Sequence, residues 1–158
     1  MCVATKTVAH TPYSRCEVAM TSTDGTKSPY EVLLYSDNVD VRAEVRSAVG
    51  ELVEDVAVRW QDVATSAALD ELVKKNRYDL IILDGEAHKV GGMGIARELK
   101  NAVYDCPPIL VLTGRAQDAW LASWSLADEA VPRPLDAFEL QSAVARLLTN
   151  KDLVPGQE

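Results

Sequence analysis

The most constraining feature of the sequence is a pair of short, wholly apolar runs in its middle, each ending at a polar residue. Residues 80–83 read Leu-Ile-Ile-Leu before Asp84, and residues 108–112 read Pro-Ile-Leu-Val-Leu before Thr113. Strands that are apolar on both faces are typical of parallel sheets with helices on either side. The chain therefore favours an α/β architecture over an all-helical or antiparallel one.

From residue 30 onward the chain alternates between strand-like runs and helical periods. Five strand–helix units joined by right-handed crossovers predict a flavodoxin-like, doubly wound parallel sheet with strand order 2-1-3-4-5. Ligands of such sheets bind beyond the carboxyl ends of the strands. The other predicted strands are 31–35, 56–60 and 129–131, and the predicted helices are 41–49, 66–76, 95–99, 116–126 and 136–148.

Composition excludes several classes of protein. The 158 residues carry 24 acidic and 16 basic side chains, a net charge of −8, which argues against nucleic-acid binding because phosphates need a basic surface. No apolar run approaches the roughly 20 residues of a membrane-spanning helix, so direct membrane insertion is not expected. Three scattered cysteines form neither a disulfide framework nor a zinc site, and they predict a reducing cytoplasm.

The chain divides into a polar N-terminal extension (1–29), one domain (30–150) and a short C-terminal tail (151–158). The extension holds nine Ser and Thr residues and no sustained apolar period. Such a segment cannot bury enough apolar surface to offset the entropy of ordering. We expect it to be disordered alone and to become ordered only against a partner.

Four polar residues follow the predicted strands at the edge where ligands would bind. Asp37 follows the first strand and Asp84 ends the third, while Thr113 and Arg133 follow the fourth and fifth. Two carboxylates with backbone carbonyls suit Mg²⁺, and a carboxylate beside that ion can accept a phosphoryl group. Alternatively, the two aspartates only cap helices and pair with Arg133. Because four such residues meet at one edge, a site is the favoured interpretation.

The chain resembles the receiver domains of bacterial two-component response regulators over about residues 31–148. The resemblance rests on residues 33–38, 79–84, 108–113 and 133–136, with Gly92 eight residues after Asp84. It implies that Asp84 is the phospho-acceptor, with Thr113 and Arg133 completing the site. It also implies a Mg²⁺ site made of Asp37, Asp84 and the backbone carbonyl of Glu86.

The sequence departs from the family pattern at three positions. Ser36 stands where the family usually has the first of two adjacent acids, and Arg133 replaces a lysine. Arginine keeps the charge but not the compact ammonium group of lysine. Ala130 occupies the position of the aromatic ring that swings when Thr113 responds to phosphorylation. Metal binding, phosphorylation and switching are therefore three separate questions for this chain.

Two tryptophans indicate a surface for a protein partner. Trp120 and Trp124 are four residues apart and so share one helix face. Tryptophan is a common interface anchor, and receivers often use the face formed by the fourth helix and fifth strand. No nucleophile–base pair or cofactor fingerprint supports an enzyme or a flavin protein on this fold, so neither an enzyme nor an organic cofactor is expected.

The leading functional hypothesis is a stand-alone atypical receiver without an output domain. It would act as a protein-interaction module or accessory subunit, through residues 1–29 and the tryptophan face. Similarity to orphan receiver-like proteins of actinobacteria implies the respiratory NADH dehydrogenase as the complex, with the protein cytoplasmic and peripheral to the membrane. The alternative is a phosphorelay protein in which a histidine kinase phosphorylates Asp84 with Mg²⁺.

Overall fold

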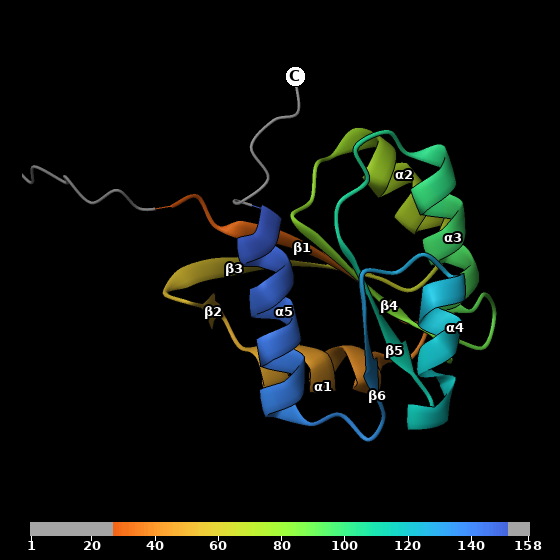
Figure 1. The fold of residues 1–158 in the computed structure, drawn as a ribbon. Helices are drawn as coiled ribbons and strands as arrows, with labels where there is room; N and C mark the ends of the chain where they lie inside the picture. Colours follow the sequence, from red (N-terminus) through yellow and green to blue (C-terminus); the bar gives the residue numbers. More distant parts are fainter. Residues whose placement is uncertain (1–26, 152–158) are drawn as a thin grey trace, which may run out of the picture.

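The computed structural model describes residues 27–151, which form a sheet with helices on both faces (Figure 1). Most of the predicted extension (1–29) and nearly all of the predicted tail (151–158) lie outside the described residues. The elements in chain order are β1 (Tyr30–Tyr35), α1 (Val39–Val49), β2 (Leu52–Val53), β3 (Val56–Val63), α2 (Ser66–Lys75), β4 (Leu80–Asp84), α3 (Gly92–Ala102), β5 (Ile109–Thr113), the 3-10 turn η1 (Ala116–Asp118), α4 (Ala119–Trp124), β6 (Glu129–Pro132) and α5 (Ala137–Lys151).

The strand order in the sheet is β2-β3-β1-β4-β5-β6. All neighbouring pairs are parallel except β2 with β3. If the short β2 is left aside, the order matches the 2-1-3-4-5 arrangement predicted from the sequence, so the flavodoxin-like doubly wound fold is confirmed. The central strand β4 is buried along its whole length, as its unbroken apolar run predicted.

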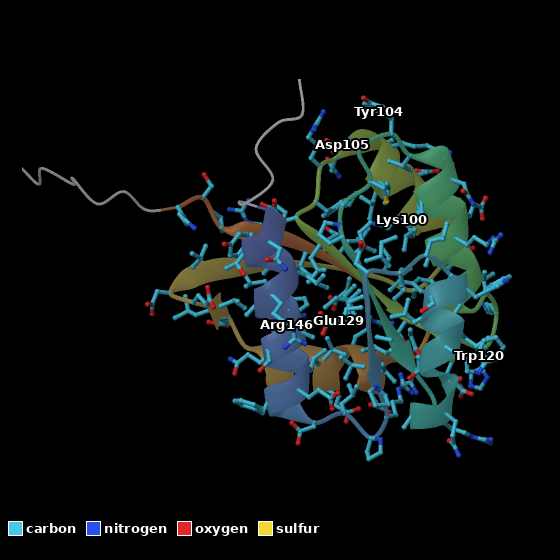
Figure 2. All side chains as sticks on the ribbon, in the orientation of Figure 1. Lys100, Tyr104, Asp105, Trp120, Glu129 and Arg146 are labelled. Atoms are coloured by element: carbon cyan, nitrogen blue, oxygen red, sulfur yellow. The ribbon has the colours of Figure 1, made fainter. Side chains whose placement is uncertain are left out.

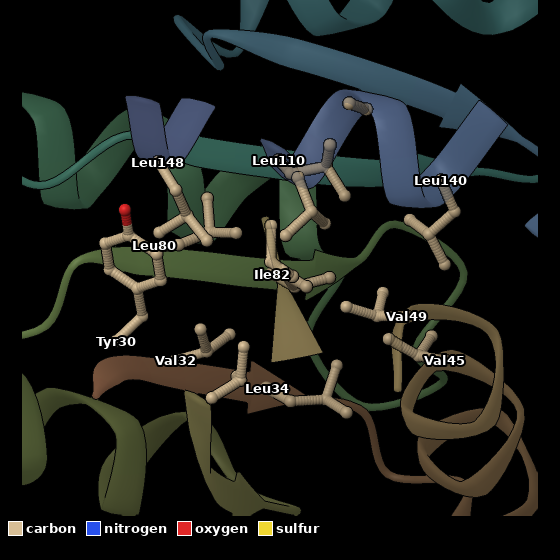
Figure 3. Packing of buried hydrophobic residues seen from close by; sticks show 14 of the residues in the cluster. Tyr30, Val32, Leu34, Val45, Val49, Leu80, Ile82, Leu110, Leu140 and Leu148 are labelled. Carbon is tan, nitrogen blue, oxygen red and sulfur yellow. The ribbon is translucent and has the colours of Figure 1, made fainter. Parts of the chain in front are cut away.

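Alternating side chains of the central strands feed two separate cores. On one face, Val32, Leu34, Leu80 and Ile82 pack with apolar residues of α1 and α5 (Figure 3). On the other face, the intervening strand residues pack against α2 and α3. Apolar surface is buried on both faces of the sheet and stabilises it by roughly 25 cal/mol per Å². This burial is the main contribution to the stability of the sheet. The carboxyl ends of the strands are thereby fixed relative to one another.

Local sequence signals place the helix ends that border this edge. Asn38 begins α1, and its side chain accepts a hydrogen bond of 2.8 Å from the backbone N–H of Asp40. Gly92 begins α3 where that helix crosses the end of β4. A Cβ atom on Gly92 would lie 2.6 Å from the backbone oxygen of Asp84, so only glycine permits this close approach.

Several elements differ from the sequence predictions. A β2–β3 hairpin was not predicted, because its two-residue turn contains neither Gly nor Asn; Glu54 and Asp55 adopt φ values of 47° and 66° instead. Strand β3 extends to Val63 rather than residue 60, since its polar outer residues hide the strand signal. The predicted helix 116–126 is shorter: it opens as the turn η1 and its α-helical part ends at Trp124.

No helix within residues 27–151 combines the length and the apolar character needed to cross a bilayer.

Candidate functional site

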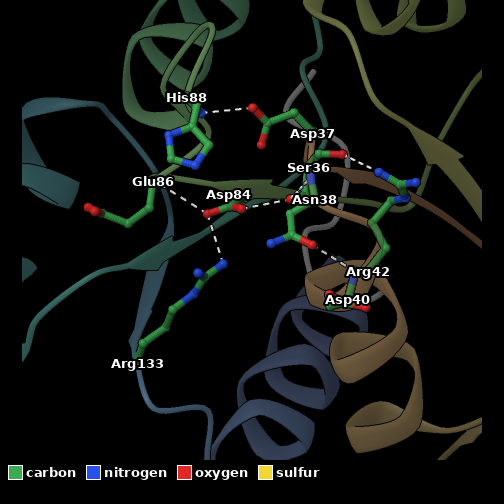
Figure 4. A network of polar contacts seen from close by, with 9 residues as sticks. All are labelled: Ser36, Asp37, Asn38, Asp40, Arg42, Asp84, Glu86, His88 and Arg133. Atoms are coloured by element: carbon green, nitrogen blue, oxygen red, sulfur yellow. Dashed lines mark hydrogen bonds and ion pairs between the residues drawn. The ribbon is translucent and has the colours of Figure 1, made fainter.

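The carboxyl ends of β1, β4 and β6 bring three of the relevant side chains into direct contact. Asp84 ends β4, Ser36 follows β1 and Arg133 follows β6 (Figure 4). Asp84 is 2% exposed and Ser36 is fully buried, although both are polar. The predicted convergence of strand-end residues is thus present for Asp84 and Arg133, and Ser36 joins them.

Both carboxylate oxygens of Asp84 have partners within the protein. The hydroxyl of Ser36 donates a 2.7 Å hydrogen bond to Oδ2, and the backbone N–H of Glu86 donates a 3.0 Å hydrogen bond to Oδ1. The Arg133 guanidinium lies with Nη2 3.0 Å from the same Oδ1. A buried carboxylate must be paired and hydrogen-bonded to be tolerated, and here the protein alone satisfies it.

Arg133 is held at the site by its backbone as well as by its charge. Its N–H donates a 2.8 Å hydrogen bond to the carbonyl of Thr113, which continues the β5–β6 pairing beyond the strand, and the Arg133–Pro134 peptide bond is cis. The contact with Asp84 is an ion pair rather than an aligned hydrogen bond, and the buried Nε has no hydrogen-bond partner in the described part of the chain. The guanidinium therefore sits beside Asp84 with donor capacity unused.

Asp37 lies on the other side of the same cleft and binds a different segment. Its Oδ2 accepts a 2.9 Å hydrogen bond from the backbone N–H of His88 in the β4–α3 loop. Tyr35 also holds this loop, since its hydroxyl donates a 2.8 Å hydrogen bond to the carbonyl of Val90. Burial raises the pKa of Tyr35, and the charges of Asp37 and Asp84 raise it further. The loop is thus tied to the end of β1 at two points.

The side chains of the remaining predicted site residues, Thr113 and Glu86, contact other groups. Thr113 is fully buried, and its hydroxyl donates a 3.2 Å hydrogen bond to the carbonyl of Arg115. The Glu86 side chain points away from Asp84 and packs against Gly114, where a Cβ atom would come within 2.6 Å of its carboxylate (Figure 4). Ala130 on β6 offers no ring that could fill space near Thr113.

The ligands predicted for a divalent cation already have contacts within the protein. Asp37, Asp84 and the carbonyl of Glu86 are the predicted ligands, but Arg133 and Ser36 already occupy the oxygens of Asp84. Arg42 adds a second nearby cation, because its Nη1 donates to the carbonyl of Ser36. Within residues 27–151, no three His, Cys, Asp or Glu side chains gather to hold a metal ion. A Mg²⁺ ion bound by Asp84 would have to displace Arg133 from Oδ1, and the metal site stays a prediction.

Three contributors to this site were not predicted from the sequence. Ser36 stands in place of a family acid, and its hydroxyl is a direct partner of Asp84. Arg42 acts on a backbone carbonyl, and no sequence pattern marks such a contact. Tyr35 reads as an ordinary apolar strand residue, yet its hydroxyl fixes the β4–α3 loop. A polar tip at the end of an otherwise aliphatic strand was the one available signal for Tyr35.

Both tryptophans of α4 are exposed, and the partner-facing role predicted for them stays a prediction. Trp120 is 67% exposed and Trp124 is 52% exposed. The Arg97 guanidinium lies 4.7 Å from the centroid of the Trp124 ring, and its Nη1 donates a 2.9 Å hydrogen bond to the Trp124 carbonyl. Arg97 therefore orders Trp124 against α3, while Trp120 projects from the domain (Figure 2).

Known proteins with similar sequences are named response regulatory proteins. No protein-family model matches the chain. Two curated relatives, both named uncharacterized response regulatory proteins, come from two strains of Mycobacterium tuberculosis. Each is 49% identical to the chain over 119 residues, which is 74% of this chain and 90% of the relative.

Solved structures of receiver domains share the fold. The signal receiver domain of a signal transduction histidine kinase from Syntrophus aciditrophicus has a TM-score of 0.67 and 22% identity, and covers 82% of this chain and 97% of its own. The receiver domain of a putative Luxo repressor protein from Vibrio parahaemolyticus has a TM-score of 0.66 and 21% identity, over 82% and 99%. With the relatives' identity and coverage, the strand-end residues lead to one conclusion: the chain belongs to the response-regulator receiver family.

Proposed function

We propose that this receiver works without phosphoryl transfer, as a stand-alone protein-interaction module or accessory subunit of a larger complex. The observation that carries the proposal is the environment of Asp84. Its carboxylate is neutralised by Arg133 and hydrogen-bonded by Ser36 and by the N–H of Glu86. A phosphoryl donor and a Mg²⁺ ion would both have to displace these partners before Asp84 could attack.

The parts that would transmit phosphorylation also support this proposal. In the family mechanism, as the resemblance implies it, Thr113 turns toward the phosphoryl group and an aromatic ring follows. Here the Thr113 hydroxyl is bound to the carbonyl of Arg115, and Ala130 stands in place of the ring. A phosphoryl group on Asp84 would therefore have no ring to move.

The proposed docking surfaces are the exposed tryptophan pair on α4 and the N-terminal extension 1–29. Trp120 and Trp124 expose large apolar rings that Arg97 only partly covers, which is the character of an interface anchor. The candidate complex is the respiratory NADH dehydrogenase, by the resemblance to actinobacterial receiver-like proteins. In that role the protein would be cytoplasmic and peripheral to the membrane.

A second candidate function is a phospho-accepting receiver in a phosphorelay with a histidine kinase. The position of Asp84 at the end of β4 favours it, since this is the acceptor position of the family. It requires Mg²⁺ bound by Asp37, Asp84 and the Glu86 carbonyl, with Thr113 and Arg133 binding the phosphoryl oxygens. In this alternative, Arg133 would have to leave Oδ1 of Asp84 when the metal binds.

Labelling with acetyl phosphate and Mg²⁺ separates the two functions. We expect no Mg²⁺-dependent phosphoryl adduct on the wild-type chain by intact mass spectrometry. Stoichiometric labelling that disappears in Asp84→Asn would establish the phosphorelay function instead. Asp40→Asn is the matched control, because it removes the same charge from an exposed residue of the same edge that is predicted neither as the acceptor nor as a Mg²⁺ ligand.

Affinity capture tests the docking surfaces. Tagged full-length protein is used to isolate its partners from cells of the source organism, in parallel with a Trp120→Ala/Trp124→Ala variant and a variant lacking residues 1–29. We expect each variant to lose partner subunits that the wild-type chain retains. If the tryptophan variant and the truncated variant each still capture every partner, including subunits of the NADH dehydrogenase, the proposed surfaces are wrong.

A further inference from the structure

A groove runs along the amino edge of the sheet, on the side of the domain opposite Asp84. Two adjoining hollows of about 300 and 500 Å³ lie there, between the α2–β4 and α3–β5 connections, the start of β1 and the middle of β3. They share Lys75, Asn76, Arg77 and Tyr78, which makes them one continuous feature, here called the amino-edge groove. Figure 2 shows Tyr104 and Asp105 at this edge, well away from Trp120.

The amino-edge groove is basic although the protein is acidic. Four cations line it, against the carboxylates of Glu31 and Asp105, whereas the whole chain has a net charge of −8. Charges more than about 8 Å away are largely screened at physiological ionic strength, so a ligand in the groove meets the local excess of positive charge. The four cations are Arg59, Lys74, Lys75 and Arg77.

Three of these cations have a carboxylate partner within the protein, in contacts that lie at the surface. Arg59 is 2.6 Å from Glu31, and the two side chains are 68% and 33% exposed. Arg77 lies 3.7 Å from Asp105, and the two side chains are 95% and 78% exposed. Lys75 pairs with Glu71 across one helical turn in an equally exposed contact. Lys74 forms no ion pair with any residue in the range 27–151. Exposed pairs of this kind contribute little to folding and are easily exchanged for a ligand carboxylate.

Helix electrostatics explain only part of this cluster. Lys74 and Lys75 lie in the last turn of α2, where positive charge offsets the helix dipole. Arg59 comes from β3 and Arg77 from the connection to β4, so the dipole does not account for them. Tyr104, beside these cations, is fully exposed. An aromatic ring with no cover next to a basic hollow has the composition of a protein interface, in which tyrosine and arginine are enriched.

We propose that the amino-edge groove binds an acidic segment of a partner protein, with carboxylates facing Lys74 and Arg77 and an apolar side chain packing on Tyr104. A nucleic acid is a poorer fit, because its phosphates extend well beyond four cations and would face the acidic remainder of the domain. The groove is independent of Asp84 and of α4. It adds a second interaction surface to the protein, whatever the fate of the proposed function.

Fluorescence anisotropy of a labelled peptide of alternating Glu and Phe tests the groove with full-length protein. We expect Lys74→Glu/Arg77→Glu to weaken binding about tenfold, since four units of charge change beside the ligand. Tyr104→Ser, at a fully exposed position, is expected to weaken it a few-fold. The matched control is Lys89→Glu/Arg115→Glu, which makes the same charge change at exposed residues of the opposite edge.

Each outcome decides for or against the groove. Loss of binding in the groove variants alone, with added salt weakening the wild-type complex, supports it. Equal loss in the control variant would show that net charge, not the groove, attracts the peptide. A peptide with Gln in place of Glu that binds as tightly would also overturn the proposal. So would tighter binding of single-stranded DNA or of phosphatidylserine vesicles, because either would assign the groove to another class of ligand.

Discussion

The cleft around Asp84 and the outer face of α4 differ in how far their candidate functional side chains are bound by other groups of the protein. Asp84 is 2% exposed, and both of its oxygens are bound by groups of the protein itself. Trp120 and Trp124 are 67% and 52% exposed, and only Trp124 has an aromatic–cation contact. The cleft is closed on itself, whereas the α4 face leaves apolar surface open to a partner.

The side chains of the two regions are therefore expected to have different roles. A carboxylate that must receive a phosphoryl group needs free oxygens and a bound cation, but the cleft supplies a hydroxyl and a guanidinium instead. In the proposed function, Asp84 instead stabilises the junction of β1, β4 and β6. On the α4 face Arg97 contacts Trp124, but both tryptophan rings remain largely exposed, so they are expected to contribute little to folding. Substitutions should affect stability in the cleft and partner binding on α4.

The largest effect is expected for Asp84→Ala. It leaves the Ser36 hydroxyl, the Glu86 N–H and the Arg133 guanidinium without their acceptor, and should lower the free energy of unfolding by about 2–4 kcal/mol. Asp37→Ala, which frees only the N–H of His88, should cost less than about 1 kcal/mol. Urea denaturation measures both. If Asp84→Ala stabilised the fold, repulsion between carboxylates would dominate and the closed cleft would be refuted.

A smaller effect is expected for Gly92→Ala, at the helix end that packs on Asp84. The new Cβ would lie 2.6 Å from the Asp84 backbone oxygen, so the start of α3 must shift, at a cost of about 1–3 kcal/mol. Gly94→Ala is the control within the same helix, because no atom lies within 4 Å of its Cβ. It should stabilise α3 by about 0.5–1 kcal/mol. Thermal unfolding of both variants tests this contrast, and equal effects would contradict it.

Tyr35→Phe is expected to cost about 1 kcal/mol, since it removes the hydrogen bond to Val90. It should also change the response to alkali. Burial raises the Tyr35 pKa above its usual 10.0, so the unfolded state ionises first and wild-type stability falls as pH rises above about 10. The phenylalanine variant should lose less stability in that range. Tyr104→Phe, at a fully exposed ring, is the control and should behave as wild type.

The smallest change in stability is expected on α4. Trp124→Ala removes the contact with Arg97 and should lower stability by about 0.5–1 kcal/mol, and Trp120→Ala should change it by less than about 0.5 kcal/mol. Both variants should nevertheless lose partner capture. A double variant that is as destabilised as Asp84→Ala would show that the tryptophans are structural, and the contrast between the two regions would fail.

The sequence predicted most of the fold because the central strands are apolar on both faces. Strands β4 and β5 follow directly from residues 80–83 and 108–112, and the strand order follows from the crossovers. The β2–β3 hairpin was missed because Glu54 and Asp55 take up a left-handed conformation that usually calls for Gly or Asn. The end of helix 116–126 was missed because Leu126 takes up a left-handed conformation, with φ 63°, and closes α4 in a local turn that usually calls for Gly.

The position of the site was predictable from the sequence, but the contacts between its side chains were not. Strand ends located Asp84 and Arg133 correctly, since parallel strands deliver their carboxyl ends to one edge. The Ser36–Asp84 hydrogen bond joins residues 48 positions apart, and its formation depends on side-chain rotamers that sequence patterns do not carry. The same limit applies to Arg42, which binds a backbone carbonyl. Packing decides whether the site residues predicted from the family pattern contact a ligand or one another.

The most direct test of the closed cleft is Mg²⁺-dependent binding of beryllofluoride, followed by fluorine NMR. The wild-type chain should show no bound signal, because Arg133 and Ser36 hold Asp84. A Ser36→Asp/Arg133→Lys variant, which restores the family's acid and lysine, should gain a bound signal that Asp84→Asn abolishes. A saturable bound signal in the wild-type chain, equal to that of the double variant, would contradict the closed cleft and establish Asp84 as a working acceptor.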